Sequence, residues 1–280
     1  MNETTYVGRL APSPTGLLHL GHARTFYMAA KRARAAKGRL WLRLEDLDAQ
    51  RSRAEFAKAI REDLRWLGIA WDAEMRQSER LDAYREAMEQ LLRGGYVYAC
   101  NCSRKDLQQT LHAPHEDDDE PVYSGRCRPD AFEHAGGGLK AETNYRFRVR
   151  DNEVVRFFDV GAGTQDFTEG CSGDADFGDF VVWRKDGLPS YQLACVVDDA
   201  ATNVTEVVRG RDLLKSTARQ ILLQHALALP TPSYFHCELM RDEAGKRLAK
   251  RHDALSLRSL RETGLSPAEI ISRFEDERSL

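Results

Sequence analysis

The stretch Arg9-Leu10-Ala11-Pro12-Ser13-Pro14-Thr15-Gly16-Leu17-Leu18-His19-Leu20-Gly21-His22 decides how this chain folds. It predicts a short strand over residues 6–10, a stiff loop with two prolines and a glycine, and an alanine-rich helix that opens near His22. The first N–H groups of a helix lack partners within the helix and carry the positive end of its dipole. The stretch therefore predicts a junction that binds an anion, with phosphate as the favoured ligand.

Two histidines, His19 and His22, flank the expected start of that helix. Their imidazole N–H groups would lie beside a bound phosphate, and Gly21 leaves room for its close approach. Donors that are fixed before a reaction can stabilise the charge that grows on a pentavalent phosphorus. An isolated histidine pair would more simply cap the helix, and it is the surrounding residues that favour the phosphate interpretation.

Length and charge set the outer limits of what the chain can do. Its 280 residues are enough to bury a core, as one large domain or two modest ones. The formal net charge of -3 provides no global basic field, so RNA contacts must come from local patches. We find no signal-peptide core and no apolar run near the roughly 20 residues needed to cross a bilayer, and we therefore expect a cytoplasmic protein.

Helical and strand patterns alternate after the opening stretch. They predict a helix over residues 23–37 that is ended by Gly38, and then a strand over 39–45. Two more helices are predicted to follow. The first is capped by Ser52, runs to Leu67 and ends at Gly68, and the second is capped by Ser78 and runs to Arg93. This order predicts an α/β fold whose parallel sheet is covered by helices. Ligands of such sheets bind at the carboxyl ends of the strands, where Ser13 and Glu45 fall.

The alternation breaks at a cysteine cluster. Cys100, Cys102 and Cys127, with the phenol of Tyr123, could converge on one tetrahedral ion, and three sulfurs plus one further ligand suit structural zinc. Three unliganded thiols are the simpler alternative. Tyrosine is an unusual zinc ligand, so His112 and His115 remain alternatives for the fourth position.

Antiparallel patterns follow the cysteine cluster. Residues 145–149 and 154–160 are predicted to form a hairpin that turns at Asp151-Asn152, and a strand over 177–184 is predicted to close at Asp186-Gly187. Residues 204–208 are predicted to form a buried parallel strand, and Ser216 is predicted to cap a helix that runs to Leu229. Ser266-Pro267-Ala268-Glu269 is a capping box at the start of one more helix.

Taken together, these motifs resemble a family. Residues 9–22 resemble the first signature of class I aminoacyl-tRNA synthetases in its glutamyl form, residues 23–25 and 42–48 continue the match, and residues 246–251 are similar to the second, lysine-serine-lysine signature. The resemblance covers residues 6–254 and is specific, because several separated motifs occur in the right order. It implies a Rossmann-like class I catalytic domain with an inserted acceptor-binding subdomain and a short helical C-terminal extension.

The resemblance also implies a role for each matching residue. Glutamate would be held by Arg9, Leu10, Ala11, Pro12, Ser13, Glu45, Tyr191 and Arg209. ATP with Mg²⁺ would be held by His19, Gly21, His22 and Lys250, of which the two histidines and Lys250 would be catalytic. In the glutamyl-queuosine branch of the family a tyrosine is the fourth zinc ligand, which matches Tyr123. Arg247 and Ala249 depart from the second signature, and the lost hydroxyl at Ala249 casts doubt on the rate, not on the reaction.

The same resemblance implies a division of the chain and an acceptor. Residues 1–97 and 186–254 would form the two catalytic halves, 98–185 the insertion with its zinc site, and 255–280 the helical extension. With no room for an anticodon-reading domain, the chain resembles the glutamyl-queuosine tRNA(Asp) synthetases most. That implies a monomer that activates glutamate with ATP and passes it to queuosine in the anticodon of tRNA(Asp). A minimal synthetase that charges a tRNA 3′ end and a catalytically silent tRNA-binding paralogue remain open. A glutaminyl synthetase is less favoured, because its loop usually has glutamate and asparagine where this chain has Ser13 and Thr15.

Overall fold

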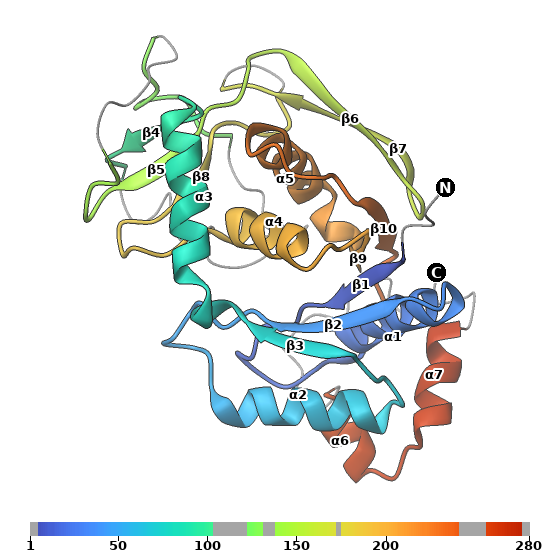
Figure 1. Ribbon diagram of the computed structural model, residues 1–280. Helices are drawn as coiled ribbons and strands as arrows, with labels where there is room; N and C mark the ends of the chain where they lie inside the picture. The colour runs from blue at the N-terminus through green and yellow to red at the C-terminus, as the bar shows by residue number, and fades with distance from the viewer. Residues whose placement is uncertain (1–4, 103–121, 131–137, 172–174, 241–255, 276–280) are drawn as a thin grey trace. The chain divides into compact units, whose positions relative to one another are not determined.

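The computed structural model describes residues 5–102, 122–130, 138–171, 175–240 and 256–275 (Figure 1). They belong to two compact units, of which the first comprises residues 1–79, 204–211 and 233–280 and the second residues 80–203 and 212–232. Each unit is described by itself below. No helix of the described ranges combines the length and the apolar character that crossing a membrane requires.

Parallel strands form the centre of the first unit. Strands β1 (Val7–Leu10), β2 (Arg39–Leu44) and β3 (Ala73–Arg76) make one parallel sheet in that order, and β9 (Glu206–Gly210) pairs in parallel with β10 (Ser233–Cys237). The start of β1 is tied to the start of β9, because Val7 N donates to Thr205 Oγ1 at 3.0 Å and Thr205 N donates to Val7 O at 2.9 Å. The α/β class with a parallel sheet, predicted from the alternating patterns, is confirmed.

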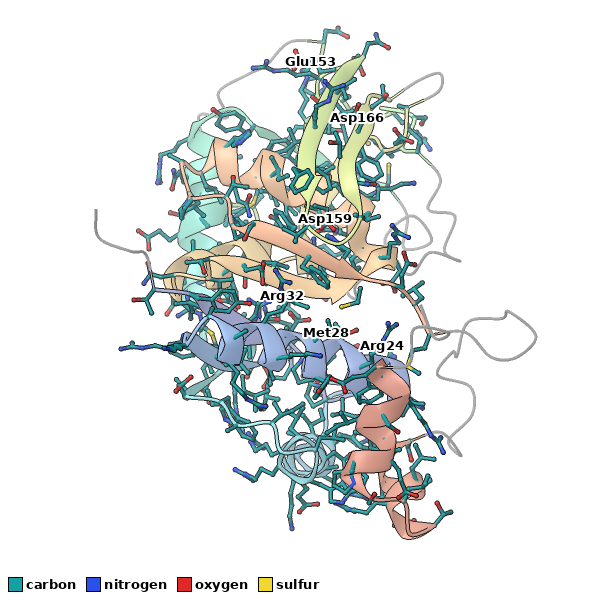
Figure 2. The ribbon with its side chains drawn as sticks, turned by 90° about the vertical axis from the view of Figure 1, so that its right-hand side faces the viewer. Arg24, Met28, Arg32, Glu153, Asp159 and Asp166 are labelled. Carbon is teal, nitrogen blue, oxygen red and sulfur yellow. The ribbon has the colours of Figure 1, made fainter. Side chains whose placement is uncertain are left out.

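Helices α1 (Leu20–Ala35), α2 (Ala54–Trp66), α6 (Leu257–Glu262) and α7 (Pro267–Glu275) complete the first unit (Figure 1). Their apolar faces and the sheet share one core, in which Leu42, Ile60 and Leu257 are fully buried. Two arginines of α1 tie the helix to its own unit, and Figure 2 shows both on the same face. Arg24 donates to the carbonyl of Glu238 at 3.0 Å, and Arg32 donates to both carboxylate oxygens of Glu206.

Several predicted helix ends are wrong. Lys37, not Gly38, takes the left-handed conformation after α1, with φ of 51°. Gly38 is required for another reason, since a Cβ there would lie 2.3 Å from the backbone oxygen of Tyr6. Ser52 and Ser78 cap no helix, because α2 starts after Arg53 and α3 after Arg80. Ser78 instead donates its hydroxyl to Asp46 at 2.8 Å.

Other predicted ends are confirmed, with one further exception. Gly68 follows α2 with φ of 72°. At the start of α7, Ser266 N donates to Glu269 Oε2 at 2.8 Å and Glu269 N donates to Ser266 Oγ at 3.3 Å, which is the predicted capping box. Ser216 is no cap, because α5 (Leu214–Ala226) starts two residues earlier and the serine hydroxyl accepts from Gln192.

The second unit is built around antiparallel pairs and three helices. Strands β4 (Val97–Cys100), β5 (Asn144–Phe147) and β8 (Phe180–Trp183) form an antiparallel sheet in that order, and β6 (Glu153–Asp159) pairs with β7 (Gly163–Glu169). The helices are α3 (Leu81–Arg93), α4 (Tyr191–Ala201) and α5. Figure 2 labels Glu153 and Asp159 on β6 and Asp166 on β7.

The predicted hairpin between residues 145–149 and 154–160 is wrong in its pairing. The chain does turn at Asn152, with φ of 64°, but β5 pairs with β4 and β8, and β6 pairs with β7. The turn at Asp186-Gly187 is confirmed, since Gly187 has φ of 81° and its N–H donates to the carbonyl of Arg184 at 3.0 Å.

Candidate active site and metal centre

The loop of the opening stretch is held against the ends of the first two strands. The N–H of Glu45, just after β2, donates to the carbonyl of Pro12 at 3.0 Å, and the N–H of Arg53 donates to that of Pro14 at the same distance. Pro12 and Pro14 are buried, whereas Ser13 between them is exposed. The carboxyl ends of β1 and β2 therefore present the Ser13 side chain and the Glu45 backbone at one edge of the sheet, as predicted.

Both histidines lie at the N-terminus of α1. His19 is the N-cap residue, in an extended conformation and with no capping hydrogen bond from its side chain, so the simple capping interpretation fails for it. Its ring lies 6.3 Å from that of His22, edge to face. A Cβ on Gly21 would meet no atom of the described residues within 4 Å, so none of these residues fills the space beside the helix start. The first turn contains no acidic residue that would repel a phosphate.

Two buried arginines, Arg9 and Arg209, lie on strands β1 and β9. Arg9 Nη1 donates to the carbonyl of Val208 at 2.9 Å, and Val208 directly precedes Arg209. Both arginines are 4 % exposed. Arg209 Nε donates to His236 Nε2 at 3.2 Å, and its guanidinium lies 5.7 Å from the centre of the Tyr234 ring. The structure thus brings together two of the cations predicted to hold glutamate.

The carboxylate of Glu45 is also held in place. Arg43 Nη2 lies 3.0 Å from Glu45 Oε1, and the two side chains are 1 % and 9 % exposed. The sequence analysis missed Arg43 and His236. Arg43 had a local signal, since the side chains of residues two apart in a strand lie on the same side. His236 had none, because it meets Arg209 through the register of β9 with β10, some 27 residues along the chain.

The remaining residues predicted to bind glutamate or ATP lie at the end of β1, in the second unit or outside the described residues. Leu10 is fully buried in the core of the first unit, so a ligand would reach only its backbone, and Ala11 is half-buried. Tyr191 is the first residue of α4, in the second unit, and its predicted pairing with Arg209 stays a prediction. Lys250, together with Arg247 and Ala249, lies outside the described residues, so the second signature is not tested.

The predicted metal ligands of the second unit do converge. The sulfurs of Cys100, Cys102 and Cys127 all lie within 4.8 Å of one another, and those of Cys102 and Cys127 are 3.6 Å apart. The Tyr123 hydroxyl lies 3.4 Å from Cys102 Sγ and 3.8 Å from Cys100 Sγ. Tetrahedral zinc with bonds of about 2.3 Å to sulfur and about 2.0 Å to oxygen would place two sulfurs about 3.8 Å apart and a sulfur and an oxygen about 3.5 Å apart. The cluster fits such an ion, whereas His112 and His115 lie outside the described residues.

The titrations of these groups are shifted by their neighbours. The hydrogen bond from the Tyr123 side chain lowers the pKa of the Cys127 thiol to about 7, whereas burial raises the pKa of Cys102 to about 11. Burial is also the main cause that raises the pKa of Tyr123. One thiol of the cluster is therefore easily ionised at neutral pH, as a metal ligand must be.

Comparison with known proteins bears on both sites. Residues 6–275 match the family of class I tRNA synthetases for glutamate and glutamine (E and Q), over its catalytic domain. The chain belongs to this family. The predicted fold class, that of a class I synthetase catalytic domain, and the predicted enzyme class, an aminoacyl-tRNA synthetase-type ligase, are thereby confirmed. Class I synthetases use ATP with Mg²⁺.

Individual members of the family are similar over almost the whole chain. A glutamyl-Q tRNA(Asp) synthetase of Symbiobacterium thermophilum is 45% identical over 280 residues, covering 95% of this chain and 84% of its own. One of Rhodobacter capsulatus is 43% identical, covering 94% and 98%. A solved glutamate tRNA ligase from Elizabethkingia meningosepticum, in complex with its amino acid, superposes with a TM-score of 0.72 at 27% identity, covering 94% of this chain and 54% of its own.

Proposed function

We propose that this class I synthetase activates L-glutamate with ATP and Mg²⁺ and transfers it to queuosine in the anticodon of tRNA(Asp). The observation that carries the proposal is that Arg9 and Arg209 are both buried on strands β1 and β9, with Arg9 hydrogen-bonded to the backbone of Val208, the residue before Arg209. Burying a cation costs several kcal/mol unless an anion or hydrogen bonds offset it. Two such cations in one unit suit a small ligand with two carboxylates.

Glutamate fits this charge pattern better than glutamine. Arg209 would bind the side-chain carboxylate, Arg9 would help to bind the substrate, and the side chain of Glu45 would hold the amino group. A neutral amide in place of the side-chain carboxylate would lose the charge-assisted hydrogen bond to Arg209, which is the kind of loss that separates similar substrates strongly. Ser13, the backbone of residues 10–12 and Tyr191 would complete the contacts.

The reaction would begin with attack of the α-carboxylate of glutamate on the α-phosphorus of ATP. A carboxyl-oxygen-to-phosphorus bond forms, the bond to the bridging oxygen breaks, and pyrophosphate leaves. His19, His22 and Lys250 would stabilise the added negative charge, and Gly21 would leave room for the phosphates. Mg²⁺ bound with ATP would neutralise phosphate charge. A hydroxyl of queuosine would then attack the adenylate carbonyl and release AMP.

The choice of queuosine rests on relatives. The glutamyl-Q tRNA(Asp) synthetases at 43–45% identity are matched over 82–98% of their length, whereas a glutamate–tRNA ligase of Aquifex aeolicus, 40% identical, is matched over 55%. We further propose that residues 98–185 act as the acceptor-binding insertion, between catalytic halves 1–97 and 186–254, with residues 255–280 as the helical extension. Zinc on Cys100, Cys102, Tyr123 and Cys127 would be structural, and the protein would work as a cytoplasmic monomer.

Transfer of labelled glutamate to purified tRNA(Asp), with and without queuosine, tests the proposal. We expect label only on the queuosine-containing tRNA, and we expect it to map to the anticodon loop. Label on a 3′-terminal adenosine would instead mean that the protein is a minimal charging synthetase. ATP–pyrophosphate exchange with glutamate alone provides a separate readout, and its absence would mean a catalytically silent paralogue.

A further inference from the structure

Arg146 is a buried cation behind the cysteine cluster. It lies on β5, the central strand of the antiparallel sheet, and is 5 % exposed. Its Nε donates to Cys100 Sγ at 3.3 Å, its Nη1 donates to the carbonyl of Asp179 at 2.8 Å, and its guanidinium carbon lies 3.7 Å from the centre of the Tyr123 ring. The side chain therefore touches two of the four predicted zinc ligands at once.

No carboxylate within the described residues forms an ion pair with Arg146. A guanidinium that is almost fully buried needs negative charge nearby, because burial of a single charge is costly. Neutral thiols and a neutral phenol would offset little of that cost. Three thiolates and a phenolate around Zn²⁺ carry a net charge of −2, so the metal-loaded cluster would supply the missing anion.

The sheet fixes the guanidinium in this position. Arg146 is the register partner of Tyr98 on β4 and of Val181 on β8. The carbonyl of Asp179 accepts the hydrogen bond from Arg146. The carboxylate of Asp179 accepts from the Tyr98 hydroxyl at 2.6 Å and from Val149 N at 2.9 Å, and these bonds hold Asp179 in place. Contacts within the sheet therefore hold the guanidinium in addition to its contacts with Cys100 and Tyr123.

We propose that Arg146 is a positioning residue of the zinc site, which fixes the Tyr123 ring as the carrier of the fourth ligand and stabilises the anionic set of ligands without touching the ion. The face of the phenol ring rests on the guanidinium through a cation–π contact, with the hydroxyl directed to the sulfurs. Groups that orient metal ligands in this way typically change metal affinity by about 10- to 100-fold. The proposal does not depend on the acceptor of glutamate.

The test compares zinc affinity in Arg146→Gln, Arg146→Lys and wild-type protein, by competition with a chromophoric chelator. We expect Arg146→Gln to weaken zinc binding by about 10- to 100-fold, with a smaller loss for Arg146→Lys, which keeps the charge. Arg156→Gln makes the same change at an exposed arginine of β6 that pairs with Asp166, and it should bind zinc as wild type does. Circular dichroism of each metal-loaded variant shows whether it has folded.

A double-mutant cycle with Tyr123→Phe tests the positioning of the ring. If Arg146 acts in part through the phenol, Arg146→Gln should weaken zinc binding less in the Tyr123→Phe background than in the wild type. In cobalt-substituted protein, Arg146→Gln should shift the visible absorption bands of the bound ion in the same direction as Tyr123→Phe. Wild-type zinc affinity in Arg146→Gln, equal losses in both backgrounds or a wild-type protein that binds no zinc would each overturn the proposal.

Discussion

Arg209 carries a positive charge in a buried position, and His236 contacts that charge through Nε2. The Arg209→Gln variant should lose the proposed charged contact with the side-chain carboxylate of glutamate. A hydrogen bond to a charged group contributes about 1.5–3 kcal/mol, so KM for glutamate should rise by about 10- to 100-fold. ATP–pyrophosphate exchange measures this, with glutamine as second substrate and Arg156→Gln as control. If the ratio of kcat/KM for glutamate over glutamine is the same as in the wild type, Arg209 does not select the substrate.

Asp63 of α2 is a buried carboxylate whose ionisation opposes folding. Burial raises its pKa to about 6, although Arg261 and Arg258 act in the opposite direction, and the nearest of their nitrogens, Arg261 Nη1, lies 3.7 Å away. The ordinary pKa of an aspartate is about 3.9. Between these two values the folded state holds a proton that the unfolded chain releases, so the free energy of unfolding falls as the pH rises from about 4 to about 6.

Asp63→Asn should flatten this dependence. The penalty in the wild type is present in full above about pH 6 and amounts to about 3 kcal/mol at most. We therefore expect the variant to gain stability relative to wild type as the pH rises from 4.5 to 7.5, as measured by urea unfolding across that range. Glu55→Gln removes an exposed charge of the same helix and should leave the slope unchanged. Parallel curves for Asp63→Asn and wild type would show that Asp63 is ionised equally in both states.

The positions of single residues could be predicted from the sequence where the residue belongs to a recognisable motif. The opening stretch identified Arg9 and His19, and the match over residues 42–48 identified Glu45; the structure places Arg9 on β1, Glu45 just after β2 and His19 at the start of α1. Prediction failed for residues whose role comes from a partner far along the chain. His236 meets Arg209 only through strand register, and Arg146 reaches Cys100 because β5 pairs with β4. No local pattern encodes such pairings.

Helices and strands could likewise be predicted from local signals, but not from contacts between segments that are distant in sequence. Alternating leucines predicted β2, and glycine after an apolar run predicted the end of α2, because both signals are local. Three predicted serine caps failed, since serine also suits positions other than caps: the Ser78 hydroxyl donates to Asp46, and Ser216 lies within α5, where its hydroxyl accepts from Gln192. The predicted hairpin failed because β5 pairs with strands that are distant in sequence, whereas adjacency had suggested β6.

The junction between α1 and β2 offers a prediction about an element. Lys37 adopts φ of 51°, and Gly38 beside it leaves no room for a Cβ next to the Tyr6 backbone. Lys37→Gly should stabilise the fold by up to about 1 kcal/mol, because glycine has no steric penalty in the left-handed region. Gly38→Ala should destabilise it by about 1–3 kcal/mol, because the neighbouring backbone must move. Urea unfolding measures whether the free energy of unfolding rises in Lys37→Gly and falls in Gly38→Ala. A Gly38→Ala protein as stable as the wild type would contradict the close approach of residue 38 to the Tyr6 backbone.

For the whole molecule, the division into two units separates the two sites. The residues proposed to hold ATP lie in the first unit where they are described, as do Arg9, Glu45 and Arg209, whereas all four predicted zinc ligands lie in the second. The parallel sheet of the first unit shares its core with α1 and α2, which alternate with its strands in sequence, and with the distant helices α6 and α7. The three-stranded sheet of the second unit also pairs strands that are distant in sequence, and the cysteine cluster adjoins the end of its strand β4. A bound metal would therefore act on this sheet and the segment beside it.

Removal of the metal should therefore lower the local stability of the second unit only. Zinc bound by Cys100, Cys102, Tyr123 and Cys127 would tie residues 122–130 to the end of β4, and the free energy of metal binding adds to the stability of the structure that forms the site. We expect a chelator to speed amide hydrogen exchange in β4 and β5 by about 10-fold or more, with β1 and β2 unchanged. Cys127→Ser should reproduce the effect without chelator, whereas Cys195→Ser, a buried cysteine of α4 outside the cluster, should not. Faster exchange to the same extent in both units would mean that the ion is not a local support, and unchanged exchange in zinc-loaded and chelated protein would rule out a structural metal at this cluster.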